Sequence, residues 1–219
     1  MSERMDPFSD PQTVARYVEG APRNVPGYHA MQRMTTLLLA ERVPEHARVL
    51  ILGAGGGLEL KAFAEAHPNW AFDGVDPSAE MLKLAQLTLG PLASRATLHQ
   101  GYISDAPIGP FDAATCLLTL HFLTLDEKRH TLAELHCRLK PGAPFVAAHF
   151  SIPQSDERAV WLSRFAAYAG IDQDQAVAID SRLTILSPEQ DEAILREAGF
   201  SNVSLFYAGF TFRGWVGYA

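Results

Sequence analysis

The chain of 219 residues has only two cysteines and no long hydrophobic run. Cys116 stands in an apolar segment and Cys137 in a helical one, so both are interpreted as small buried residues. That interpretation excludes a disulfide framework or a cysteine metal site. No apolar segment approaches the ~20 residues that a membrane-spanning helix needs. Residues 1–10 contain acids and no apolar core, so no signal peptide is expected, and the cytoplasm is the expected location.

Basic residues are fewer than acidic ones, with 18 Lys and Arg against 25 Asp and Glu. The formal net charge is −7 and the sequence pI is about 5.6, which argues against broad or direct nucleic-acid binding. Hydrophobic residues make up 47% and charged residues 20%, as in an ordinary globular protein. The length suits a single domain, residues 1–219. The expected partner is a small-molecule acceptor, with a homodimer left open and no membrane contact expected.

Apolar runs and helical patterns alternate through the middle of the chain. The capping box Thr124–Glu127 marks one helix start, and Pro141-Gly142 follows that helix. Such alternation predicts a parallel sheet with helices on both faces. Two aromatic-rich strands at the end are predicted to form a hairpin, which would give the sheet an antiparallel strand. Strands are predicted at 47–52, 70–75, 96–100, 111–118, 143–150, 202–207 and 209–217, and helices at 57–67, 78–89, 125–139 and from Ser187 to Gly199.

Two further segments are predicted to cover the sheet as lids. Residues 1–45 look helical, with a helix at 28–42, and residues 151–186 contain helical runs at 157–169 and 173–179. Aromatic residues are concentrated in these segments and predict a small, partly apolar acceptor pocket. They are Tyr17, Tyr28, Trp161, Phe165 and Tyr168.

A glycine cluster follows the first predicted strand. Gly53, Gly55 and Gly57 let the backbone turn tightly and approach a ligand, and Asp76 ends the second strand, where an acid can accept hydrogen bonds from a ribose. The sixth position of the dinucleotide fingerprint is Leu58 rather than glycine or alanine, which argues against a nicotinamide dehydrogenase. No Gly-Lys-Ser/Thr follows, so the loop is not a P-loop. The pattern predicts a nucleoside-binding βαβ unit.

Four segments, VLILGAGGG, FDGVDPSAEML, FDAATCLLTLHFL and LKPGA, occur in the order and spacing of class I S-adenosylmethionine (SAM) methyltransferases. The chain resembles that family over residues 45–150. The resemblance implies a Rossmann-like, doubly wound, seven-stranded α/β sheet, with SAM as cofactor and S-adenosyl-L-homocysteine (SAH) as product. It also implies cofactor-binding residues: Gly53, Ala54 and Gly55 at the amino-acid part, Asp76 with Pro77 at the ribose, Tyr102 with Ile103 at the adenine, and Leu117 near the methyl donor.

The segments NVPGYHAMQRMTTLLLAER and EAGFSNVSLFYAGFTFRGWVGYA resemble carboxy-S-adenosylmethionine synthases, which serve wobble-uridine modification in transfer RNA. There the tyrosine of VPGY reaches the cofactor, so Tyr28 is its counterpart. The acid usual two residues before the first glycine is Ile51 here, and the acid usual after the third strand is Tyr102. Where that group has an asparagine in the fourth strand, this chain has Leu117. Arg182 lies in the region that supplies the arginine for the extra carboxylate.

Two histidines stand near the carboxyl ends of strands. His121 follows the fourth strand and His149 lies near the end of the fifth, and either imidazole could take a proton from an acceptor or be a hydrogen-bonded structural residue. His121 is the candidate base, and no metal ligands are predicted. The sequence favours a SAM-dependent methyltransferase for a small molecule. Alternatives are a carboxy-SAM synthase that uses SAM and prephenate, or a non-catalytic SAM-binding protein.

Overall fold

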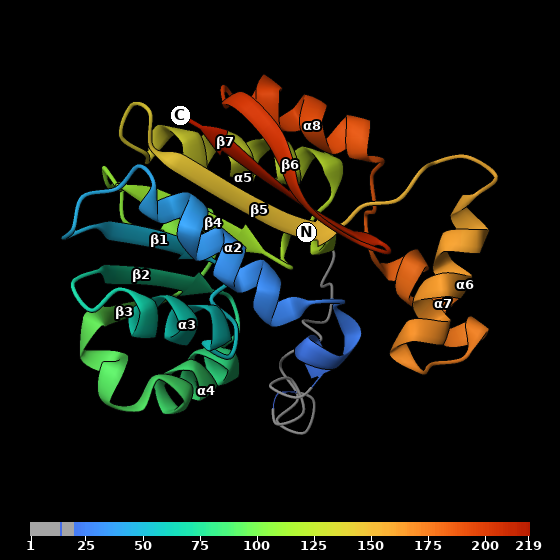
Figure 1. Ribbon diagram of the computed structural model, residues 1–219, viewed down its shortest axis with the longest axis horizontal. Helices are drawn as coiled ribbons and strands as arrows, with labels where there is room; N and C mark the ends of the chain where they lie inside the picture. Colours follow the sequence, from blue (N-terminus) through green and yellow to red (C-terminus); the bar gives the residue numbers. More distant parts are fainter. Residues whose placement is uncertain (1–13, 15–19) are drawn as a thin grey trace.

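The computed structural model describes residue 14 and residues 20–219 (Figure 1). Tyr17 and most of the first part of the predicted lid lie outside the described residues. A seven-stranded sheet in the order β3-β2-β1-β4-β5-β7-β6 forms the centre. No helix in the described ranges has both the length and the apolar character for a membrane span. The strands are β1 Arg48–Leu52, β2 Ala71–Asp76, β3 Ala96–Gln100, β4 Ala113–Leu117, β5 Pro144–Phe150, β6 Ser201–Gly209 and β7 Phe212–Tyr218.

The central strands are apolar on both sides because helices cover both faces of the sheet. Successive side chains of a strand point to opposite faces. Val49 and Ile51 of β1 therefore pack in the cluster beneath α2, α3 and α4, whereas Leu50 and Leu52 pack beneath α5 and α8. Figure 1 shows this layering. The helices are α2 Tyr28–Ala40, α3 Leu58–Ala66, α4 Ala79–Leu89, α5 Leu125–Cys137, α6 Arg158–Ala169, α7 Gln173–Arg182 and α8 Pro188–Glu197, with short 3₁₀ turns η1 Gly90–Arg95, η2 Ile103–Asp105 and η3 Leu120–Phe122.

The winding of the sheet reverses between β1 and β4. Both strands run parallel, with Ile51 opposite Thr115, and they leave towards opposite sides of the sheet. In open α/β sheets a ligand site forms beyond the carboxyl ends of the strands at such a reversal. The ends of β1 and β4 are therefore the place in this fold where a ligand site is expected.

The predicted α/β fold with an antiparallel hairpin is confirmed, with small corrections. β7 runs antiparallel to both β5 and β6. Gly209 still belongs to β6, and the second strand of the hairpin begins at Phe212 because Phe210 and Thr211 form the turn. Cys116 is buried as predicted, but the prediction for Cys137 is wrong because its side chain is exposed at the end of α5.

The segment between β5 and α8 forms α6 and α7, which lie beyond the carboxyl ends of the strands (Figure 1). Its two ends are tied to each other and to the sheet. Ser151 and Leu186 form a parallel bridge, and the Gln154 amide donates to the carbonyl of Ile185 at 3.0 Å. The base of the insert is thus fixed next to the crevice.

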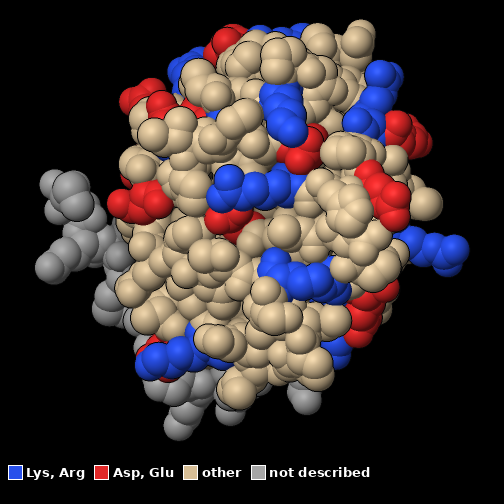
Figure 2. All heavy atoms as spheres, turned by 90° about the vertical axis from the view of Figure 1, so that its left-hand side faces the viewer, with Lys and Arg blue, Asp and Glu red and all other residues tan. Residues whose placement is uncertain are grey.

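Charges of both signs are interspersed on the face shown in Figure 2, which is the left-hand side of Figure 1. Arg48 pairs with Asp73 at 2.7 Å and Lys140 pairs with Asp112 at 2.6 Å. On this face acidic side chains lie among the basic ones.

Candidate functional site

The glycine loop connects β1 to α3 at the winding reversal. Gly53 has φ 79°, a left-handed conformation that favours glycine. A Cβ at Gly53 would lie 1.9 Å from the hydroxyl oxygen of Thr119, so the loop also lies directly against the chain that leaves β4. The amides of Gly53 and Ala54 both donate to the carbonyl of Val75, at 2.8 and 3.0 Å. These contacts attach the loop to both neighbouring strands.

Asp76 joins the end of β2 to this loop. Its Oδ2 accepts the amide of Gly55 at 2.9 Å, and its Oδ1 accepts the amide of Ser78 at 2.9 Å. The Ser78 hydroxyl in turn caps α4 by accepting the amide of Met81 at 3.2 Å. The carboxylate is thereby held in a fixed place beside the glycine loop. Asp76 and Gly55, separated by 21 residues, meet where the sequence predicted a ribose contact.

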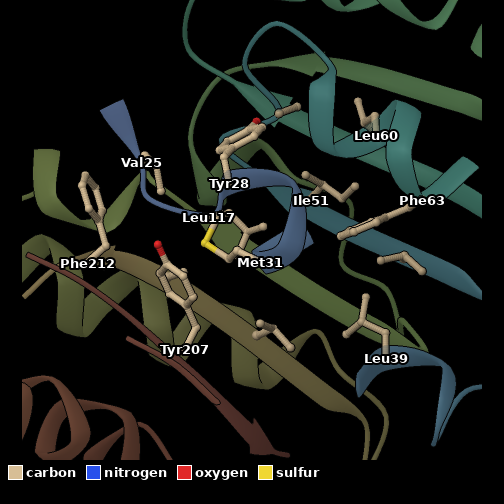
Figure 3. Close-up of a cluster of buried hydrophobic side chains, with 14 of the residues drawn as sticks. Val25, Tyr28, Met31, Leu39, Ile51, Leu60, Phe63, Leu117, Tyr207 and Phe212 are labelled. Carbon is tan, nitrogen blue, oxygen red and sulfur yellow. The ribbon is translucent and has the colours of Figure 1, made fainter. Parts of the chain in front are cut away.

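The loop borders a narrow cavity under the first turns of α2. Tyr28, Gly53, Ala54 and Leu117, all predicted site residues, line it together. The cavity encloses about 10 Å³, roughly the space of one water. Two of the lining side chains are joined, because the Gln32 amide donates to the Tyr28 hydroxyl at 3.0 Å. Figure 3 shows Tyr28, Met31 and Leu117 close together in the same cluster. A ligand larger than water needs more room than this cavity has. The remaining lining residues are Met31, Gln32, Leu58, Glu59 and Leu118.

Glu59 is the acidic residue of this cavity, and the sequence analysis did not identify it. It lies in the first turn of α3 with 7% of its surface exposed, and its Oε1 accepts the hydroxyl of Thr115. Burial raises the pKa of this carboxyl to about 8, although the Thr115 hydrogen bond opposes the rise. The helical spacing of the sequence could have predicted its burial, because Glu59 lies on the buried side of α3 with Leu60, Phe63 and Ala64.

The residues predicted at the adenine lie on the rim of the crevice but do not line the cavity. The amide of Gly101 donates to the carbonyl of Asp76 at 3.0 Å, so the chain that leads from β3 into η2 is attached to the end of β2. Tyr102 is 62% exposed there, and Ile103 is buried in the cluster beneath α5 and α8. Pro77 accepts the Gln100 side-chain amide at 3.3 Å. A ligand at this rim would meet the Tyr102 ring before Ile103.

His121, the candidate base, is buried behind the cavity and is not among its lining residues. Its Nδ1 accepts the amide of Phe150 at 3.4 Å. Burial lowers its pKa well below the usual value, and the neighbouring His149 and Lys128 lower it further. The imidazole is therefore neutral near pH 7, with its hydrogen on Nε2 because Nδ1 accepts the Phe150 amide. His149 lies 3.0 Å from Asp191 beneath α8, on the far side of the sheet from α2.

The geometry can be compared with known proteins. A family model described as a methyltransferase domain matches residues 50–145. This range contains the glycine loop, Asp76, Tyr102 and the end of β4. Residues 50–145 are therefore similar to a methyltransferase domain. The resemblance expected from the four sequence segments is confirmed.

Curated relatives match almost the whole chain. The carboxy-S-adenosyl-L-methionine synthase of Chromohalobacter salexigens is 27% identical over 229 residues, covering 99% of this chain and 85% of its own. The enzyme of the same name from Campylobacter fetus is 20% identical, covering 95% of this chain and 93% of its own. These relatives extend the similarity beyond the methyltransferase domain, into α2 and the C-terminal hairpin.

Solved structures share the fold. Human N-acetylserotonin methyltransferase in complex with SAM is similar, with a TM-score of 0.64 and 13% identity over 97% of this chain. This chain spans only 57% of that protein. At this identity the likeness shows the fold alone, and it confirms the predicted class I methyltransferase architecture.

Proposed function

We propose that the chain binds SAM at the carboxyl ends of β1, β2 and β4 and transfers its methyl group to a small-molecule acceptor. The observation that carries this proposal is the junction of Asp76 with the glycine loop at the winding reversal. A fixed carboxylate beside a side-chain-free bend suits a ribose next to a backbone-bound group. The relatives named above are all proteins whose names or structures involve SAM, which supports the choice of cofactor.

The residues present fit this cofactor, although the cavity beside the glycine loop has to widen to hold it. Gly53, Ala54 and Gly55 would hold its amino-acid part, Asp76 and Pro77 its ribose, and Leu117 would border its methyl group. SAM supplies an electrophilic methyl group, and SAH is the product. The chain itself has to orient the acceptor and exclude water. Tyr28 would close over the bound cofactor from α2.

The acceptor would bind between α2 and the α6–α7 insert. Trp161 and Phe165 of α6 pack against the cluster that contains Tyr28, and Tyr168 lies exposed on the same helix. These aromatics favour a flat, partly apolar acceptor. His121 lies behind the end of β4 and is the candidate base if the acceptor has a proton to lose. To take that proton, its Nδ1 would have to release the Phe150 amide.

A carboxy-SAM synthase is the second candidate, favoured by the names of the curated relatives. Such an enzyme must neutralise one more carboxylate than a methyltransferase. The cavity-lining residues of the described chain include no arginine or lysine. Arg182 is exposed at the end of α7, and Arg164 stacks over the ring of Trp161 at 4.5 Å. Arg213 of β7 also lies over the Trp161 ring, at 5.7 Å. The absence of a cation among the described residues that line the cavity favours methyl transfer.

Isothermal titration calorimetry with SAM and SAH tests the proposal. Both should bind, and Asp76→Ala should weaken both by roughly 1.5–3 kcal/mol, the range for hydrogen bonds to charged groups. Asp73→Ala is the matched control, because Asp73 lies on the same strand and its carboxylate also has side-chain partners, Arg48 and His99, at a place away from the site. An Asp76→Ala protein that is folded and binds SAH like the parent would refute the site.

Mass spectrometry separates the two candidates. The protein is incubated with SAM, with and without prephenate. Formation of carboxy-SAM only with prephenate would establish the second candidate and displace the first. Formation of SAH with a methylated small-molecule acceptor, independent of prephenate, would support methyl transfer.

A further inference from the structure

Glu59 is a buried carboxyl group that faces the cavity without a cation. Its Oε1 accepts the Thr115 hydroxyl, and Oε2 has no hydrogen-bond donor among the described residues. The lining residues beside it are Gln32, Met31 and backbone of the glycine loop, together with apolar side chains. A carboxyl group in such surroundings is costly unless a donor or a positive charge meets it. The cavity is thus built to take a cationic hydrogen-bond donor.

The position of Glu59 indicates which part of a ligand it meets. It stands in the first turn of α3, two residues after Gly57, and its carboxyl group reaches back over β1 to Thr115 of β4. Thr115 is directly opposite Ile51 in the β1–β4 register, so the carboxyl group lies under the glycine loop, away from the Asp76 side. The loop end of the site is where the proposed function places the amino-acid part of SAM.

We infer that Glu59 binds the α-ammonium group of the cofactor and that its carboxyl group supplies the negative charge of this subsite. The inference rests on the proposed function. The sulfonium is the other cation of SAM. It has no hydrogen to donate, so it could not give Oε2 the hydrogen bond that this oxygen lacks. A primary ammonium satisfies both the charge and the hydrogen bond.

Binding of an ammonium group beside Glu59 should release a proton from its carboxyl group. With a pKa raised to about 8, Glu59 carries a proton in most molecules at pH 7 before a ligand binds. An ammonium ion beside it favours the carboxylate and lowers this pKa. Binding then releases close to one proton from Glu59. The other ionisable group coupled to it, the Cys116 thiol on β4, stays neutral because burial raises its pKa far above the usual range.

The test uses the full chain and three ligands: SAM, SAH, and the SAH analogue in which hydrogen replaces the amino group. Glu59→Gln keeps the shape of the side chain and an acceptor for Thr115. It should weaken SAM and SAH alike, by roughly 10- to 100-fold for a lost charge-assisted hydrogen bond. The affinity for the analogue should stay unchanged. Glu65→Gln on the exposed side of α3 is the matched control and should change none of the three.

Proton release is measured by calorimetry at pH 7 in two buffers with different ionisation enthalpies. The parent and Glu65→Gln should release close to one proton with SAH, and Glu59→Gln should release none. The inference is wrong if Glu59→Gln binds SAH like the parent, or if it loses affinity for SAH and the analogue equally. It is also wrong if only the affinity for SAM falls, because Glu59 would then interact with the sulfonium and not with the ammonium group. A parent protein that binds neither SAM nor SAH would refute the proposed function itself.

Discussion

A group of buried charges between β5, α5 and α8 offers the sharpest test of how this fold is stabilised. Lys128 of α5 and Asp191 of α8 are both 0% exposed, and His149 of β5 is 1% exposed. The Asp191 carboxylate lies 3.0 Å from His149 Nε2, and the Lys128 ammonium donates to the carbonyl of Thr184 at 2.6 Å. Asp191→Asn keeps the shape of this side chain and removes its charge.

The expected loss is large because a charge remains behind. Burial lowers the pKa of Lys128, and the charge of Asp191 opposes that fall. Without Asp191 the buried ammonium retains only a neutral carbonyl as its partner. Removing one member of a buried ionic group costs ~3–5 kcal/mol. For a chain of this size, ~1 kcal/mol shifts the melting temperature by about 2–4 °C, so a fall of roughly 6–20 °C is expected.

Thermal unfolding followed by circular dichroism measures the effect, and the chain contains a matched control. Glu197 and Arg129 also connect α8 to α5, at 3.2 Å, but about half of each side chain is exposed. Glu197→Gln should cost no more than ~1 kcal/mol, as surface ion pairs do. If Asp191→Asn melts together with this control, the buried charge of Asp191 does not stabilise the fold and the reasoning fails.

The loss should depend on pH in a defined direction. The pKa of Lys128 is lower in the folded than in the unfolded chain, so the unfolded chain binds more protons as pH rises through this window. Stability therefore increases with pH there. Removing Asp191 lowers the folded pKa further and starts the window at a lower pH. The deficit of Asp191→Asn should shrink between pH 7 and pH 10, and a deficit that grows would contradict this assignment.

Two further predictions concern the loop and the candidate base. Gly57 and Gly142 have nearly the same φ, 80° and 77°. A Cβ at Gly57 would lie 2.7 Å from Ala85 Cα, whereas a Cβ at Gly142 would have no atom within 4 Å among the described residues other than its chain neighbours. Gly142→Ala should cost about 1–2 kcal/mol of left-handed strain and Gly57→Ala clearly more in chemical denaturation, and equal costs would exclude the clash. Because the pKa of His121 is well below its usual value, methyl transfer should show no protonation limb from His121 between pH 6 and pH 8. A limb in this range that disappears in His121→Asn would show that the imidazole is not neutral there.

The fold could be predicted from the sequence because its signals are local and repeated. Apolar runs on β1 and β4 need both faces covered, and the glycine loop and Asp76 fix where the winding reverses. Capping boxes gave the helix starts, as at Thr124, where the side chain and Glu127 cap each other. The hairpin was misplaced because Gly209 looked like a turn residue, whereas Phe210 takes the positive φ.

The chemistry within the cavity was less predictable because it depends on contacts across the sheet. Glu59 looked like an ordinary acid in the first turn of a helix, a position that the helix dipole favours. Only the arrangement of α3 over β1 and β4 brings it to Thr115. Cys137 shows the opposite error, since its helical pattern suggested burial but α5 ends there at the surface.

The two faces of the sheet treat buried charge differently, and the difference has a thermodynamic consequence. Beneath α5 and α8, Asp191 has the Lys128 ammonium as a cationic neighbour and lies 3.0 Å from His149, so its charge stabilises the folded chain without a ligand. Beneath α2 and α3, Glu59 faces a cavity that contains no cation from the described chain, so folding has to bury a carboxyl group at a cost. A ligand that brings an ammonium group removes that cost. SAH should therefore raise the melting temperature of the parent more than that of Glu59→Gln at equal ligand concentration, because the stabilisation follows the ratio of ligand concentration to Kd.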